Sequence, residues 1–377
     1  MKFASTLLAL SLGLAFVPAQ ADINIGVTLS ATGPAASLGI PEKNTFAILP
    51  TQVAGEKINF IVLDDATDPS AATKNARKLT TEDKVDVIIG SSSTPAAAAV
   101  AEVANESKTP QVSMSPVALP ESKNPWVFRV PQQNSVMARA LVDHMREKGV
   151  KQLGFIGYSD AYGEDWLKSV TAACEAAGIK LAAVERYNRT DTSVTGQVLK
   201  LVAARPDAVL IVGSGTPAAL PHLALVERGF KGQIYQTHAA ANPEFLKIGG
   251  KAIEGGILPV GPVTVASQLP DSHPSKKVAV EYVKRYEEKY GAGSFSSFGA
   301  YAHDAFRLIE RAIPAALKKA RPGTPEFRLA LRDALESERD VVGAHGVFNM
   351  TPADHFGLDQ RSRVLVHIEN GGWKLVK

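Results

Sequence analysis

Residues 85–95 read VDVIIGSSSTP, and this stretch decides the fold class of the chain. Its first five residues are Val or Ile apart from Asp86, an almost continuous apolar run that is typical of a strand buried on both faces of a parallel sheet. Gly90 ends the run, and a Ser or Thr followed by Pro95 signals a helix start, which the alanine-rich segment 96–104 continues. The stretch therefore predicts a buried strand followed directly by a helix.

The turn between this strand and its helix consists of residues with hydroxyl groups. Ligands of open α/β sheets bind beyond the carboxyl ends of the strands, where a helix N-terminus offers free N–H groups and a partial positive charge. We therefore predict that Ser92, Ser93 and Thr94 hold the carboxylate of a small ligand. A well-capped turn that binds no ligand is the alternative interpretation.

The rest of the chain repeats this alternation of strand and helix. Further strands are expected at 23–29, 58–63, 111–114, 153–158, 180–187, 207–212, 232–236 and 255–259, and helices at 70–81, 135–148, up to 177, 193–204, 217–228, 275–290, 298–317 and 326–335. Loops are expected at 31–39 and 41–57, and a β-rich tail at 346–377 with a hairpin turn at Gly371-Gly372. The alternation predicts an α/β fold, with two doubly wound parallel-sheet units joined by several crossings, the first near 128–131.

Composition and motifs exclude several classes of function. The chain has 377 residues, enough for two domains, with 45% apolar and 21% charged residues and a net charge of +3 that is not clustered into a nucleic-acid footprint. It contains no P-loop, no G-x-G-x-x-G after a strand, no G-x-S-x-G elbow and no H-E-x-x-H pair. We therefore expect no cofactor, no metal and no enzymatic activity.

The first residues are typical of a secretory signal. Lys2 is followed by an apolar core at 7–17 and by Ala19-Gln20-Ala21, a small-residue cleavage site. The apolar stretch is too short to span a membrane. We expect residues 1–21 to be removed as a signal peptide and the mature chain to lie in the periplasm.

Polar or aromatic loops follow six of the predicted strands. These loops are 32–38, 91–94, 113–118, 159–162, 212–216 and 237–241. If the two sheets face each other, all six loops meet in one cleft, which would be mostly apolar with a few placed polar groups.

These loops resemble those of the leucine/isoleucine/valine-binding proteins, which are type I periplasmic binding proteins of ABC transporters. The likeness covers nearly the whole mature chain, and it is strongest at 33–39, 64–69, 90–95 and 160–164, with support from 298–301 and 370–373. The resemblance implies two lobes that close on a ligand like a flytrap, formed by 22–133 plus 264–345 and by 134–263 plus 346–377. It also implies a monomer that delivers its ligand to permease subunits in the inner membrane.

The resemblance assigns roles to individual residues. The ligand carboxylate would be held by the Ser93 and Thr94 turn and by the loop near Ser115 and Val117. Leu38 stands where some members have a tryptophan over the ligand, and Ser214 stands where another aromatic residue is often found. Tyr162 matches a tyrosine that the second lobe brings down on closure, although a core aromatic at a helix start is the alternative.

One departure from the family pattern concerns the ligand. Amino-acid binders carry a Glu that pairs with the ligand ammonium after the strand at 232–236, but here that position reads Thr237-His238-Ala239-Ala240. An unpaired ammonium in a closed cleft is costly. Asp160, the nearest other acid, is expected to cap a helix.

We therefore expect a carboxylate ligand with an apolar or aromatic body and no essential ammonium, such as a benzoate or a phenylpropenoate. His238 would read a distal hydroxyl, carbonyl or second carboxylate, unless it is a packing residue. A receptor for branched-chain or other amino acids, and a sensor that presents its ligand to a membrane regulator, are the alternatives.

Overall fold

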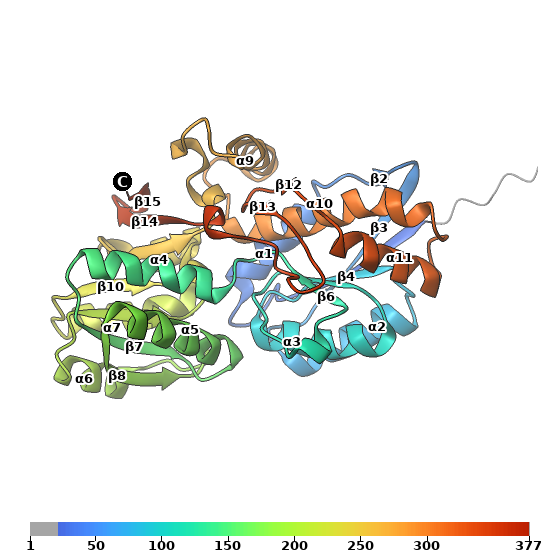
Figure 1. Ribbon diagram of the computed structural model, residues 1–377. Coiled ribbons are helices and arrows are strands. Elements are labelled where there is room, and N and C mark those ends of the chain that lie inside the picture. The colour runs from blue at the N-terminus through green and yellow to red at the C-terminus, as the bar shows by residue number, and fades with distance from the viewer. Residues whose placement is uncertain (1–21, 377) are drawn as a thin grey trace, which may run out of the picture.

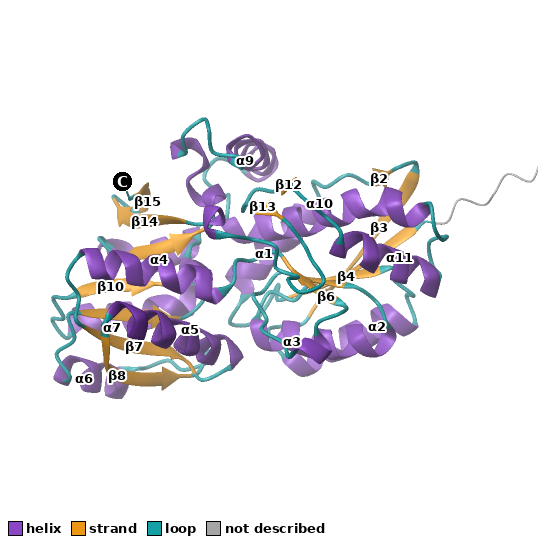
Figure 2. Cartoon of the chain, in the orientation of Figure 1, coloured by secondary structure: helices purple, strands orange, loops and turns teal. Residues whose placement is uncertain are grey.

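The computed structural model describes residues 22–376 and shows two α/β lobes lying side by side (Figure 1). Each lobe is built on one largely parallel sheet with helices packed on both faces (Figure 2). The predicted fold class is therefore confirmed. The expected signal peptide at 1–21 lies outside the described residues.

The sheet of the first lobe has six strands in the order β2-β3-β1-β4-β5-β6, and only β2 is antiparallel to its neighbour. The strands are β1 (Ile23–Leu29), β2 (Gln52–Val53), β3 (Glu56–Asp64), β4 (Val87–Ile89), β5 (Gln111–Ser113) and β6 (Val127–Arg129). The helices near it are α1 (Ala36–Phe46), α2 (Pro69–Thr81), α3 (Thr94–Ser107), α9 (Lys276–Tyr290), α10 (Ser297–Leu317) and α11 (Pro325–Glu336). The small pair β12 (Val341–Val342) and β13 (Val347–Phe348) follows α11.

The sheet of the second lobe has seven strands in the order β15-β14-β11-β10-β9-β7-β8. Strand β14 is antiparallel to both of its neighbours, β11 and β15. The strands are β7 (Gln152–Tyr158), β8 (Lys180–Tyr187), β9 (Ala208–Val212), β10 (Gln233–Gln236), β11 (Ile257–Val260), β14 (Val364–Glu369) and β15 (Gly372–Leu375). Its helices are α4 (Asn134–Glu147), α5 (Ala161–Ala177), α6 (Thr195–Ala203), α7 (Ala219–Glu227) and the unforeseen α8 (Pro243–Gly249). The turn of the C-terminal hairpin is formed by Asn370 and Gly371, both with positive φ, and not by Gly371 and Gly372 as predicted, because Gly372 pairs with Glu369 in the ladder.

The stretch 85–95 forms the expected strand and helix. All three residues of β4 are buried, and β4 pairs in parallel with β1 on one side and β5 on the other. The helix α3 begins at Thr94, one residue before Pro95. Because the strand lies at the centre of its sheet, the turn that follows it opens at the middle of the sheet's carboxyl edge.

The prediction of loops at 31–39 and 41–57 is wrong at 36–46, which form α1, and at 52–53 and 56–57, which belong to β2 and β3. This helix includes Pro41, and it packs against α10 across the sequence. Its buried face is formed by Leu38, Pro41, Glu42, Thr45 and Phe46. The spacing is helical, but three of these side chains are Pro, Glu and Thr, so the apolar periodicity that would have indicated a helix is absent.

The chain passes between the lobes after β6, after β11 and before β14. The first crossing begins later than predicted, because 127–129 pair with β5 as an edge strand. Gln132 lies where the crossings meet: its Nε2 donates to Ser362 O (2.7 Å), and its Oε1 accepts from the Tyr301 hydroxyl (3.2 Å). The lobe boundaries themselves stay a prediction. His355 lies in the segment predicted for the second lobe, but its carbonyl oxygen accepts from Arg129 N of β6 in the first lobe (2.9 Å).

A glycine in the first turn of α5 sets how closely this helix approaches β7. A Cβ at Gly163 would lie 1.7 Å from the carbonyl oxygen of Tyr158, a backbone atom that cannot move without displacing the strand. We predict that Gly163→Ala lowers the free energy of unfolding by about 1–3 kcal/mol or more, as overpacking does. Urea unfolding followed by circular dichroism measures this.

Gly196 in α6 is the matched control, since a Cβ there meets nothing within 4 Å. Gly196→Ala is expected to leave the stability unchanged or slightly higher, because Ala is the better helix former. Equal stability of both variants would contradict the proposed steric role of Gly163.

Candidate ligand-binding site

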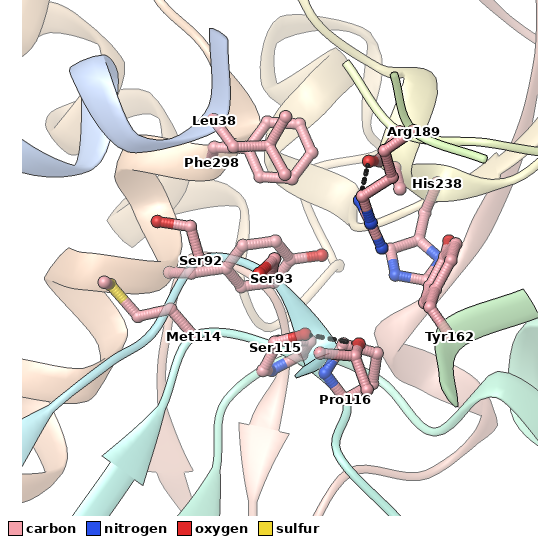
Figure 3. Close-up of a pocket in the computed structure, with 15 residues that line it drawn as sticks. Leu38, Ser92, Ser93, Met114, Ser115, Pro116, Tyr162, Arg189, His238 and Phe298 are labelled. Carbon is pink, nitrogen blue, oxygen red and sulfur yellow. Dashed lines mark hydrogen bonds between the residues drawn. The ribbon is translucent and has the colours of Figure 1, made fainter. Parts of the chain in front are cut away.

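A cavity lies between the carboxyl edges of the two sheets, and residues of both lobes line it. The first lobe and its crossing contribute Leu38, Ser92, Ser93, Thr94, Met114, Ser115, Pro116, Pro131, Phe298 and Tyr301, and the second contributes Tyr162, Arg189, Ser214, His238 and Ala239. Figure 3 shows the serine side chains on one side of the cavity and Arg189, His238 and Tyr162 on the other.

The hydroxyl wall of the cavity is formed by the turn before α3. Ser93 occupies the N-cap position of α3, but its side chain makes no capping hydrogen bond, and its buried Oγ has no partner within residues 22–376. Thr94 Oγ1 and Ser115 Oγ lie 2.7 Å apart and share a hydrogen bond. The Ser93 hydroxyl and the free N–H groups of the first turn of α3 are therefore available to an anion.

The buried carboxylate of Asp65 fixes the position of the turn before α3. Asp65 follows β3 and accepts hydrogen bonds from Ser91 Oγ (2.6 Å), Ser30 Oγ (2.7 Å) and Thr28 Oγ1 (3.1 Å). These donors come from β1 and from the two turns at the carboxyl ends of β1 and β4. The position of the serine turn is thus fixed by contacts between segments distant in sequence.

Apolar and aromatic side chains form the body of the cavity. Leu38 lies in the first turn of α1, Met114 follows β5, and Phe298 and Tyr301 lie one turn apart on α10. All four are buried. The ring centroids of Phe298 and Tyr301 are 6.0 Å apart at 66°, an edge-to-face arrangement that offers aromatic surface to a ligand.

Tyr162 and His238 face the cavity from the second lobe. The Tyr162 hydroxyl donates to Thr237 Oγ1 (2.8 Å), which places the phenol beside the turn after β10. His238 lies edge-on to Tyr162, with ring centroids 6.4 Å apart, and its Nδ1 has no partner in the described part of the chain. Burial lowers the pKa of His238 to about 3, and the charge of His345 adds to this shift. At neutral pH His238 is therefore uncharged, and it offers one ring N–H donor and one acceptor.

Arg189 supplies the cation of the cavity. Its Nε donates to Asp160 Oδ2 (2.6 Å), and its Nη1 donates to Ser214 Oγ (2.8 Å). The guanidinium carbon lies 4.2 Å from the ring centroid of Tyr158, a stacked position. Asp160 also accepts from the backbone N–H groups of Tyr162 and Gly163, so it caps α5 as predicted.

Every site residue predicted from the sequence lines the cavity except Val117. The side chain of Val117 points into a small apolar cluster with Ala97, Ala101 and Val127 instead. Its carbonyl oxygen accepts from Arg129 Nε (3.0 Å). Val117 therefore supports the loop after β5 and does not face the cavity.

Sequence reasoning missed Arg189 and the aromatic pair Phe298 and Tyr301. Arg189 follows β8, so the rule that ligands bind after strands could have found it, but the loop at 188–189 was not among the six considered. Phe298 and Tyr301 lie inside a helix that follows no strand of either sheet. No local signal connects them to the site, because they reach the cavity through the packing of α10 on α1.

The lobes are in contact on two sides of the cavity. Ser297 Oγ at the start of α10 donates to Ala241 O (3.0 Å) after β10. A Cβ at Gly215, where φ is +58°, would lie 2.4 Å from Ser37 Oγ. The structure is therefore a closed form, in which the second lobe covers the hydroxyl wall of the first.

Two kinds of feature are absent from residues 22–376. No group of three or more His, Cys, Asp or Glu side chains is placed to hold a metal ion. Over the same range, no helix has the length and apolar character needed to cross a bilayer.

Comparison with known proteins places these features in context. Residues 22–371 match a family model described as periplasmic binding protein. The Leu/Ile/Val-binding protein homolog 3 of Brucella melitensis biotype 1 is 25% identical over 344 residues, which is 87% of each chain.

Similar solved structures include two from Rhodopseudomonas palustris. An extracellular ligand-binding receptor from Rhodopseudomonas palustris HaA2 is 48% identical, with a TM-score of 0.93 over 95% of this chain and 100% of that one. A solute-binding protein of an ABC transporter from R. palustris, solved in complex with benzoate, is 20% identical with a TM-score of 0.79, over 94% and 96% of the two chains. The similarity to the second structure shows a shared fold.

The buried neutral state of His238 makes a prediction about acid stability. An unfolded histidine takes up a proton below about pH 6.5, whereas folded His238 does so only near its lowered pKa of about 3. The unfolded state binds more protons in this window, so acidification destabilises the fold by about 1.4 kcal/mol per pH unit for this residue. We expect urea unfolding between pH 6 and 4 to show a shallower pH dependence, by that amount, in His238→Gln.

His222 on α7 lies outside the cavity, and burial lowers its pKa to about 4. It therefore tests the same effect of a buried neutral histidine on acid stability. His222→Gln should also flatten the pH dependence. An unchanged slope in His238→Gln would mean that His238 is protonated in the folded protein.

Proposed function

Because the chain belongs to the periplasmic binding protein family, we propose that it is a receptor for a small carboxylate with an apolar or aromatic body and no essential ammonium group. The receptor hands this ligand to the permease of an ABC importer and performs no chemistry on it. It acts as a monomer in the periplasm after removal of residues 1–21.

One observation carries the proposal: the residues that line the cavity include hydroxyls and one arginine but no Asp or Glu. Ser93 and the N-terminus of α3 offer unused hydrogen-bond donors to an anion. Taking an ion out of water costs several kcal/mol unless a partner compensates for the loss. A carboxylate finds that partner in this cavity, whereas an α-ammonium group finds no acid.

The apolar part of the cavity supports an aromatic or similar ligand body. Leu38, Phe298 and Tyr301 from the first lobe and Tyr162 from the second are all buried around the same space. Aromatic side chains pack against a flat ring through edge-to-face and offset contacts. The fold itself accommodates such a ligand, since a protein of the same architecture holds benzoate.

The second lobe can read the distal end of the ligand. Neutral His238 offers a donor and an acceptor to a hydroxyl or carbonyl group, and Arg189 offers charge to a second carboxylate. Both residues come from the lobe opposite the serine turn. A ligand that reaches from the hydroxyl wall to these groups therefore favours the closed form over the open one, and the closed form docks on the permease.

A thermal-shift screen of the mature protein, unfolded and refolded to remove bound ligand, tests this proposal. The panel contains benzoate, cinnamate, hydroxylated forms of both, aliphatic acids, and leucine, isoleucine and valine. We predict that aromatic acids raise the unfolding midpoint, because a ligand at about 100 times its Kd adds roughly 2.7 kcal/mol of stability.

A shift with branched-chain amino acids alone would contradict the proposal. It would favour an amino-acid receptor, the class to which the name of the Brucella relative points. His238→Ala and Arg189→Gln, measured with the acid that shifts most, then show which group reads its distal end.

Ser93→Ala tests the hydroxyl wall directly. The Ser93 Oγ has no partner in the described structure, so its removal should leave the stability of the ligand-free protein unchanged. A hydrogen bond to a charged group contributes about 1.5–3 kcal/mol, and we therefore predict that Kd for the bound acid rises roughly 10- to 100-fold. Isothermal titration calorimetry measures this.

Ser107→Ala at the other end of α3 is the control, because its hydroxyl donates to Val103 O within the helix (2.7 Å). Its Kd should match that of the unmodified protein. If Ser93→Ala binds the acid with unchanged affinity, the carboxylate does not lie at the start of α3.

A further inference from the structure

A glutamate side chain is buried directly behind the hydroxyl wall. Glu42 lies on α1 with no exposed surface, and its Oε2 shares a short hydrogen bond with Ser92 Oγ. The other oxygen, Oε1, is buried and has no partner among residues 22–376. An ionised carboxylate in such a place would lack most of the hydrogen bonds that it needs.

The nearby Asp65 shows how different a well-satisfied carboxylate is. Asp65 is also fully buried, but it accepts from three hydroxyls and from the backbone N–H of Thr67 (3.1 Å). Glu42 has one partner where Asp65 has four. Glu42 therefore has too few donors for a charged carboxylate, and its surroundings favour the neutral carboxylic acid.

The groups that face Glu42 also favour its neutral form. Asp65 approaches from the turn after β3, and the Tyr301 phenol approaches from α10. Ser92, from the turn after β4, is uncharged. Burial raises the pKa of Glu42 well above its ordinary value, and the charge of Asp65 adds to this, although the Ser92 hydrogen bond acts in the opposite direction.

The protonation state of Glu42 decides what Ser92 can do. Ser92 Oγ already accepts from the backbone N–H of Ser30 (2.9 Å), and its hydroxyl has a single proton. If Glu42 is ionised, that proton is donated to Glu42 and none is left for the cavity. If Glu42 is protonated, it donates to Ser92, and the hydroxyl proton of Ser92 is free to turn into the cavity that this residue lines.

We propose that Glu42 is a positioning residue for the ligand: as a neutral acid it donates to Ser92, frees the Ser92 hydroxyl to donate to the ligand carboxylate, and so couples anion binding to retention of its own proton. This inference rests on the proposed function, because it requires an anionic ligand at the serine turn. The proton stays on Glu42 throughout, and no bond of the ligand is changed.

The coupling has a defined sign. An ionised Glu42 both withdraws the Ser92 proton and repels the incoming carboxylate, so the ligand binds the protonated form of the protein. Above the pKa of Glu42 in the free protein, Kd should rise up to tenfold per pH unit, and binding there should take up one proton. Below that pKa, Kd should be independent of pH.

The experiment compares the unmodified protein with Glu42→Gln, whose amide can donate to Ser92 at every pH. Calorimetry with cinnamate and with benzoate, from about pH 5.5 to 8.5, keeps both ligands ionised. Buffers of different ionisation enthalpy report the protons taken up. We expect Kd to rise with pH and a proton to be taken up in the unmodified protein, and neither effect in Glu42→Gln.

A second measurement needs no ligand. The infrared C=O band of a protonated carboxylic acid at neutral pH should disappear in Glu42→Gln and persist in Glu326→Gln, which alters an exposed glutamate at the start of α11. Absence of this band from the unmodified protein would overturn the inference even if Glu42→Gln failed to fold.

The remaining outcomes separate the two proposals. If the acids bind but Kd follows pH equally in Glu42→Gln, or is independent of pH although the infrared band is lost within the same pH range, the coupling is refuted and the proposed ligand class stands. If neither acid binds either protein, the ligand class is refuted and the coupling with it.

Discussion

The site depends on one buried charge, the carboxylate of Asp65. It accepts hydrogen bonds from Thr28, Ser30 and Ser91, and its own backbone N–H donates to Leu29 O (2.9 Å). A buried carboxylate is tolerated only where donors surround it, so these segments must come together for the lobe to fold. The same requirement sets the serine turn at the start of α3, and the geometry of the cavity follows from it.

In the second lobe a buried ion pair orders the cavity wall, and the charged group at the cavity is a cation, Arg189. Asp160 caps α5 and pairs with Arg189, which stacks on Tyr158 and donates to Ser214. This ion pair is largely buried, with 13% and 23% of the two side chains exposed, so it is held by geometry more firmly than a surface pair would be. Each lobe thus presents a preorganised polar edge, and the apolar body of the cavity lies between them.

Much of this arrangement follows from local sequence. The central strand β4 (Val87–Ile89), the helix start at Thr94 and the polar loops after the strands are encoded by apolar runs, caps and interrupting Gly and Pro residues, which act within a few residues. The helix α1 was missed at 31–57 because such local signals are absent there. In α1 the buried face contains Pro41, Glu42 and Thr45. Glu42 bonds Ser92 and Thr45 bonds Tyr282, both distant in sequence, so the local pattern gives no indication of a helix.

The sequence by itself determined most of the strands and helices, the two-lobed α/β class and the loops that meet at the cleft, but it missed α1, β2, β6 and α8. Only the tertiary structure decided that Arg189, Phe298 and Tyr301 join those loops, that Val117 turns away, and that Glu42 lies behind Ser92. The physical reason is range. Caps and strand periodicity act between near neighbours, whereas the bond between Glu42 and Ser92 spans 50 residues and exists only once α1 has packed beside the central strands.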